Sequence, residues 1–148
     1  MNFNFVTARI AVGSAPSSPD DIVTLLNYGI TGIINLYEVD DTQYFGICKF
    51  AYLHNPTPDD GTPKPTSWFK ESIEFGLSHL SLTNTKLYCH CQAGINRGPS
   101  TAYAIMRAGY SLLSEDTLLL IRKHRLVDIV GVRYASDAEA ALKEMGYA

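Results

Sequence analysis

The sequence lacks long apolar runs and an excess of basic charge, and each absence removes a class of function. Its 148 residues contain no stretch of about 18 consecutive apolar residues and no basic leader ahead of one, so neither a membrane span nor a secretion signal is indicated. The formal net charge of −3 gives no general attraction to nucleic acid or to anionic lipid. We therefore expect a soluble cytoplasmic protein that has neither a nucleic acid nor a membrane as its partner.

Cysteine is also scarce, which argues against a fold built on disulfides. Three cysteines are an odd and small number for such a framework, and Cys89 and Cys91 are too close in one extended segment to bridge easily. A metal site at these two residues and His90 is disfavoured, because strand alternation sends the histidine to the opposite face and no second pair of ligands occurs. We interpret the cysteines as thiols and keep open a regulatory disulfide from Cys48 or Cys89 to Cys91.

Apolar segments of strand type and of helix type alternate along the chain. The β-branched run from Ile30 to Leu36 is typical of a strand buried on both faces of a parallel sheet, whereas the apolar residues between 66 and 82 recur at helical spacing. Strands are predicted at residues 9–13, 30–36, 51–54 and 86–90, and helices at residues 19–28, 66–82, 99–108, 114–124 and 136–146.

This order of elements predicts an α/β fold with a mostly parallel central sheet of four or five strands flanked by helices. A chain of 148 residues with 46% hydrophobic content buries one sizeable core rather than two, so we expect a single domain over residues 1–148, and a monomer. Ligands of such sheets bind beyond the carboxyl ends of the strands.

Local signals mark several helix ends and one loop. Ser18 is predicted to cap the first helix, and the pattern from Ser136 to Glu139 is predicted to open the last one through reciprocal capping. Residues 122–125, which read RKHR, are interpreted as a solvated helix end. The segment at 55–65 holds four prolines and a glycine, so we expect an irregular loop there.

The segment CHCQAGINRGPST, residues 89–101, follows the last predicted strand and leads into a helix. Between Cys91 and Arg97 lie five residues, which are enough to wrap backbone N–H groups around one tetrahedral anion. Gly94 supplies the positive φ that such a turn requires, the following helix points its positive end at the same place, and Arg97 adds a planar fork for phosphate oxygens. The predicted phosphate-binding residues are Gln92, Ala93, Gly94, Ile95, Asn96 and Arg97.

Cys91 lies at the base of this predicted cradle. A free thiol has a pKa near 8.5, and a helix N-terminus or a nearby cation can bring a cysteine pKa to roughly 3.5–7.5. Cys91 is therefore expected to attack phosphorus while Arg97 and the loop amides hold the other oxygens.

The segment HCQAGINRGPS resembles the HC-x5-R signature of cysteine-dependent protein phosphatases, and the chain looks most like their compact dual-specificity branch. Further resemblance lies in IAVGSAP, GITGIINL, YLHNPTPDDGTP and LIRKHR, in this order. The resemblance implies that Cys91 is the nucleophile, Arg97 the ligand of the phosphate and the transition state, and His90 a residue that orients the cysteine loop. It also implies a phosphocysteine intermediate, with no metal and no other cofactor.

The resemblance implies an aspartate acid on an upstream loop, and a proton donor is chemically required for the leaving alkoxide. Aligning PTPDDGTP with the P-x-x-D pattern of the family selects Asp59, and Asp60 remains a competitor. This order, with the acid before the cysteine, disfavours low-molecular-weight phosphatases, which place the acid after it.

Gly98 departs from the family, in which the residue after the arginine commonly carries a hydroxyl that assists the second step. Hydrolysis of the intermediate is expected to be slower unless Ser100 or Thr101 supplies that hydroxyl.

The leading interpretation is a phosphatase of phosphotyrosine and phosphoserine or phosphothreonine, with a phosphoprotein as its partner. A second keeps the chemistry on a glucan, phosphoinositide, nucleotide or RNA 5′-phosphate, and a third is a phosphate-binding pseudophosphatase.

Overall fold

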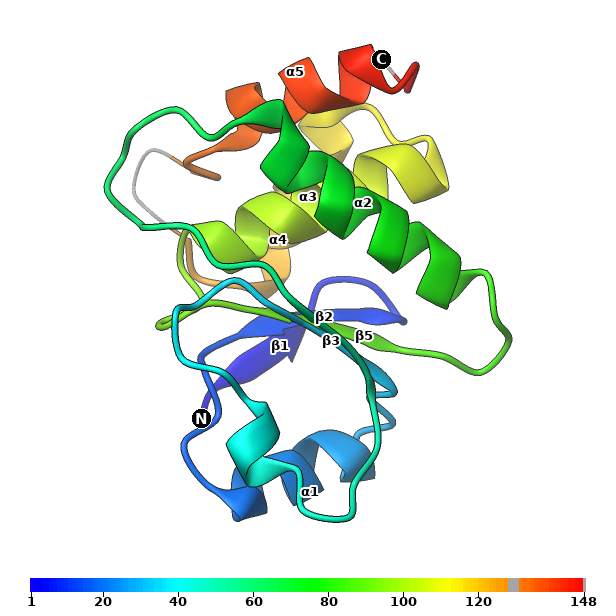
Figure 1. Ribbon diagram of the computed structural model, residues 1–148. Helices are drawn as coiled ribbons and strands as arrows, with labels where there is room; N and C mark the ends of the chain where they lie inside the picture. Colours follow the sequence, from blue (N-terminus) through cyan, green and yellow to red (C-terminus); the bar gives the residue numbers. More distant parts are fainter. Residues whose placement is uncertain (128–130, 148) are drawn as a thin grey trace.

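A computed structural model describes residues 1–127 and 131–147, which form a five-stranded sheet with helices on both faces (Figure 1). The strand order is β1-β2-β5-β3-β4, and every pairing is parallel except that of β1 with β2. The predicted α/β class and mostly parallel sheet are thereby confirmed. The strands are β1 (Phe3–Phe5), β2 (Ile10–Gly13), β3 (Gly32–Asn35), β4 (Ala51–His54) and β5 (Leu87–His90).

The helices are divided unequally between the two faces of the sheet. Figure 1 shows α1 on one face and the other four helices gathered on the opposite face. Among the described residues, no helix is long and apolar enough to cross a bilayer. The helices are α1 (Pro19–Asn27), α2 (Thr66–Leu80), α3 (Arg97–Tyr110), α4 (Ser114–His124) and α5 (Ala135–Glu144), with a short 3-10 helix, η1 (Thr42–Tyr44).

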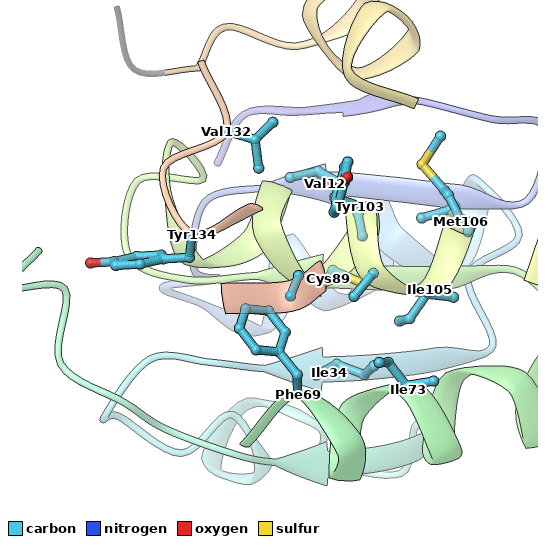
Figure 2. Packing of buried hydrophobic residues seen from close by; sticks show 14 of the residues in the cluster. Val12, Ile34, Phe69, Ile73, Cys89, Tyr103, Ile105, Met106, Val132 and Tyr134 are labelled. Atoms are coloured by element: carbon cyan, nitrogen blue, oxygen red, sulfur yellow. The ribbon is translucent and has the colours of Figure 1, made fainter. Parts of the chain in front are cut away.

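The two faces of the sheet belong to separate hydrophobic clusters because side chains alternate along each strand. Cys89 of β5 packs in the larger cluster with α2 and α3, whereas its neighbour Tyr88 packs in the smaller cluster with α1. Figure 2 shows Phe69 and Ile73 of α2 opposite the sheet and α3 in the larger cluster. All four β5 side chains are buried, so the segment that follows Tyr88 and Cys89 starts from a fixed position.

Two helix starts illustrate where local patterns succeed and fail. Ser18 caps α1 as predicted, since its hydroxyl accepts the Asp21 N–H. The predicted capping pattern of the last helix is wrong, because α5 begins at Ala135 and has no side-chain cap. Glu139 instead accepts hydrogen bonds from the Arg107 guanidinium, which is a stronger, charged partner than a backbone N–H.

Residues 55–65 contain no helix and no strand, as predicted from their prolines. Strand β1 was not predicted. It has only three residues and lies at the antiparallel edge of the sheet, where short and half-buried strands carry little pattern.

Candidate active site

The carboxyl ends of the parallel strands meet at one edge of the sheet, and the segment after β5 begins there. His90, the last residue of β5, is aligned with Gly13 of β2 on one side and with Asn35 of β3 on the other. Residues 91–97, which we call the cysteine loop, follow at once and run into α3. The loop therefore lies where ligands bind in sheets of this kind.

Gly94 gives the cysteine loop its tight shape. Its φ is +73°, in the left-handed region that glycine adopts without strain. A Cβ atom at this position would come within 2.4 Å of the Gly13 backbone and of Arg125 Nη2. Conformation and space both require glycine here, as the sequence pattern predicted.

The sulfur of Cys91 lies at the amino-terminal end of α3. Its Sγ accepts the backbone N–H of Gly98 at 3.3 Å, and only 2% of the residue is exposed. This N–H is one of the free donors of the first helical turn, and the positive end of the helix dipole favours negative charge at the same point. The start of α3 thus provides a hydrogen-bond donor to the Cys91 sulfur.

Arg97 is buried beside the loop with one polar atom unused. Its Nη1 donates to the Thr57 carbonyl and to Glu38 Oε1, each at 2.8 Å, and the residue is 4% exposed. The Nε–H is buried and has no hydrogen-bond partner. Because an unpaired buried donor costs roughly 1–3 kcal/mol, an oxyanion that reached this nitrogen would gain that interaction.

Behind the cysteine, His90 is paired with a carboxylate that the sequence did not reveal. Its Nε2 is hydrogen-bonded to Oδ2 of Asp41, and its Nδ1 lies 3.1 Å from the carbonyl oxygen of Cys91. Both His90 and Asp41 are buried. Asp41 stands in a turn with no motif around it, so no sequence signal could have singled it out.

The two candidate acids, one residue apart, have different surroundings. Asp59 Oδ2 accepts the side-chain N–H of Asn96 in the cysteine loop at 3.0 Å. Asp60 instead accepts from Thr62 and, at 3.0 Å, from Lys64 Nζ within its own loop. These hydrogen bonds, first from Thr62 and then from Lys64, hold the pKa of the exposed Asp60 well below its usual range. Only Asp59 of the two has a contact with the cysteine loop among the described hydrogen bonds.

Arg125 corrects the interpretation of residues 122–125 as a solvated helix end. Residues 122–124 are exposed, but Arg125 is 7% exposed and its guanidinium donates to the carbonyls of Ala93 and Gly94 at 2.9 and 3.0 Å. Its Nη1 also binds Asn4 Oδ1. Burial lowers the pKa of this arginine. A cation thus supports the backbone of the cysteine loop. Arg125 follows the last helical residue of α4, and the sequence pattern does not distinguish it from the exposed basic residues before it.

Ser100 and Thr101 were the expected alternative sources of a hydroxyl. The Ser100 hydroxyl donates to the Asn96 carbonyl at 2.7 Å and accepts the N–H of Tyr134, so its proton is committed to the loop backbone. Thr101 Oγ1 is buried without a partner. The side chains of the remaining predicted loop residues are exposed at Gln92 and Ala93 and half-buried at Ile95 and Asn96.

The three cysteines are free, so the structure contains no disulfide between them. Cys89 is buried, and burial raises the pKa of its thiol well above the usual range. Cys48 is half-buried and packs with the cluster on the α1 face, whereas Cys89 and Cys91 belong to the other cluster. Within residues 1–127 and 131–147, no three His, Cys, Asp or Glu side chains are grouped as ligands for a metal.

A cleft of about 320 Å³ lies beside the cysteine loop. The ring of Tyr37, on its wall, lies 5.7 Å from the centre of the Arg97 guanidinium. The lining residues are Ala15, Pro16, Ser17, Tyr37, Val39, Asp41, Tyr44 and Gln92.

Comparison with known proteins finds phosphatases among the relatives of this chain. No protein-family model matches the chain. Phosphoglucan phosphatase DSP4 of Castanea sativa is 27% identical over 133 residues, which cover 80% of this chain and 36% of the relative. Dual specificity protein phosphatase 1 of Homo sapiens is 24% identical over 99 residues, which cover 67% of this chain and 26% of the relative. The chain thus spans between about a quarter and little more than a third of the length of these relatives.

The fold has matches among solved structures as well. PTPMT1 in complex with PI(5)P has a TM-score of 0.75 at 14% identity, over 97% of this chain and 99% of that protein. The predicted resemblance to dual-specificity phosphatases and the predicted cysteine-phosphatase fold are confirmed.

Proposed function

We propose that this relative of the cysteine-dependent dual-specificity phosphatases hydrolyses phosphate monoesters, with Cys91 as nucleophile, Arg97 as phosphate ligand and Asp59 as acid. One observation carries the proposal: the Cys91 sulfur accepts the Gly98 N–H at the start of α3. The unpartnered Nε of Arg97, at the end of the same loop, supports the same chemistry, because both features favour an anion in the loop.

In the first step the Cys91 thiolate attacks phosphorus. An S–P bond forms while the P–O ester bond breaks, and Asp59 gives its proton to the leaving oxygen. The products are the free alcohol and a phosphocysteine. Arg97 and the loop amides hold the three remaining oxygens, where the transition state concentrates its charge.

In the second step water attacks the phosphocysteine. The Asp59 carboxylate takes a proton from that water, the S–P bond breaks, and inorganic phosphate leaves with the thiolate restored. Gly98 provides no hydroxyl to assist the sulfur as leaving group, and the Ser100 hydroxyl donates elsewhere. We therefore propose that this second step limits turnover.

A single phosphate on an uncharged or basic carrier suits the surroundings of the cysteine loop best. Asp40 is exposed on the segment that runs along the cleft, and its negative charge disfavours carriers with several phosphates. A phosphoprotein is the leading substrate. A phosphoglucan is the second, because a relative of this chain is a phosphoglucan phosphatase. We propose that residues 1–148 act as one catalytic domain, monomeric and cytoplasmic, without a metal or other cofactor.

The test is hydrolysis of para-nitrophenyl phosphate in the presence of a chelator, followed by phosphopeptides, phosphoglucans, phosphoinositides and nucleotides. Wild-type protein should turn over the aryl phosphate and be inhibited by vanadate. Cys91→Ser should abolish turnover while still binding inorganic phosphate. Turnover that persists in Cys91→Ser would rule out the proposed mechanism, and binding without turnover in the wild type would indicate a pseudophosphatase.

A further inference from the structure

Tyr134 joins the loop at residues 55–65, which we call the aspartate loop, to the first turn of α3. Its hydroxyl donates to Asp59 Oδ1 at 2.7 Å and accepts the backbone N–H of Gly61 at 3.1 Å. The other carboxylate oxygen of Asp59, Oδ2, accepts from Asn96. Each carboxylate oxygen of Asp59 thus has its own hydrogen-bond donor, Tyr134 for Oδ1 and Asn96 for Oδ2.

The position of Tyr134 is itself fixed. The residue is 1% exposed, it belongs to the larger hydrophobic cluster, and its backbone N–H donates to Ser100 Oγ in the first turn of α3. Figure 2 shows its ring at the edge of the cluster, with the hydroxyl pointing away from the labelled core side chains. A packed ring that leaves only its hydroxyl for bonding has little freedom to move.

Lys64 holds the aspartate loop from within. It is 5% exposed, and its Nζ donates to the Pro58 carbonyl and lies 3.0 Å from Asp60 Oδ1. The same ammonium group lies 5.0 Å from the centre of the Tyr134 ring. The ring therefore meets the loop twice, through its hydroxyl at Asp59 and through its face at Lys64.

We propose that Tyr134 is a positioning residue that sets which oxygen of Asp59 delivers the proton. This inference rests on the proposed function of Asp59 as the acid. A protonated carboxyl keeps one acceptor oxygen, and Tyr134 holds Oδ1 in that role. The proton is then carried by Oδ2, the oxygen on the side of the cysteine loop, where the leaving group replaces the Asn96 N–H.

The phenol must stay protonated to keep this role. Burial, together with the hydrogen bond to Asp59, raises the pKa of Tyr134 to about 12. Its O–H therefore remains a donor throughout the pH range in which a phosphatase works.

Tyr134→Phe tests the inference through the leaving group. For an alkyl phosphate, whose leaving group needs a proton, kcat/KM, which reports formation of the phosphocysteine, should fall roughly tenfold, as a share of the 10²–10⁴ that general acids contribute. For dinitrophenyl phosphate, whose leaving group needs none, kcat/KM should change by less than about twofold. In an Asp59→Asn background the same substitution should cause no further loss on either substrate.

Tyr103→Phe is the matched control. Tyr103 is also buried and also donates to a carboxylate, that of Glu139, but it lies among α3 and α5 residues that make no contact with Asp59 in the described hydrogen bonds. Tyr103→Phe should lower the melting temperature and leave the ratio of kcat/KM for the alkyl phosphate to kcat/KM for dinitrophenyl phosphate unchanged.

An equal fall of kcat/KM on both substrates in Tyr134→Phe would overturn the inference, since it would indicate general damage to the fold. If Tyr134→Phe does not fold by circular dichroism, Lys64→Met carries the test, with the same selective loss expected at smaller size and the same result overturning it. A wild-type protein that hydrolyses neither substrate would instead refute the proposed function.

Discussion

The cysteine loop and the aspartate loop supply the two halves of the proposed chemistry and are held in different ways. The cysteine loop lies between a buried strand and a helix, and its backbone is fixed by Gly94 and by Arg125. The aspartate loop has no regular structure and is held by the side chains of Lys64 and Tyr134. The first loop is anchored at both ends by regular structure and supported by one arginine 31 positions from Gly94, whereas the second depends on a tyrosine 75 positions from Asp59. A few polar contacts therefore decide whether the acid reaches its place.

Asp59→Asn should produce the largest change in this comparison. We expect kcat/KM for alkyl phosphates to fall about 100-fold, because the amide cannot supply a proton, and kcat/KM for dinitrophenyl phosphate to fall far less. Asp60→Asn is the matched control one residue away and should leave both rates near those of the wild type. The reverse outcome, with the selective loss in Asp60→Asn, would assign the acid to Asp60.

Arg125→Met tests the support of the cysteine loop. The change leaves the buried carbonyls of Ala93 and Gly94 without their donor, which should lower the free energy of unfolding by about 2–3 kcal/mol. Inorganic phosphate should bind more weakly, and both classes of substrate should lose rate together, unlike in Asp59→Asn. Arg122→Met, at an exposed position three residues earlier, is the control. Urea unfolding and a phosphate titration measure the two effects, and unchanged phosphate affinity would contradict the supporting role.

The smallest effect is expected for Asp60→Asn in acid. Hydrogen bonds from Thr62 and Lys64 lower the pKa of Asp60 in the folded chain below the unfolded value of about 3.9. The ionised carboxylate therefore stabilises the fold above that pH, and the stabilisation is lost as the pH falls through the lowered folded value. Melting temperatures of the wild type should decline more steeply than those of Asp60→Asn below about pH 4. Parallel curves would show that this turn does not stabilise the aspartate loop.

The sequence was informative where chemistry and position are encoded by adjacent residues. The order of strands and helices predicted the sheet, and the spacing from Cys91 to Arg97 with Gly94 between them predicted a loop around the sulfur. Asp59 was selected by the resemblance to a known family. The different surroundings of Asp59 and Asp60 could be read only from the structure, because an irregular loop has no periodic pattern that fixes its alignment to within one residue.

Residues that act through tertiary contacts were not predictable. Asp41 meets His90 from 49 positions away, and Tyr134 meets Asp59 from 75 positions away. Arg125 ends a helix in an ordinary basic cluster, and only the inward turn of the chain carries it beneath the cysteine loop. No local pattern distinguishes these side chains from solvated ones, since the partner of each is fixed only when the sheet and helices have packed.

The covalent intermediate gives the most direct test of the central claim. Wild-type protein is mixed with an aryl phosphate, quenched in acid during turnover and digested, and the mass of the peptide that contains Cys91 is measured. The account predicts that this peptide gains one phosphoryl group at Cys91 and that Cys91→Ser gains none. Steady turnover with no adduct at any time, or an adduct at a different residue, would contradict it.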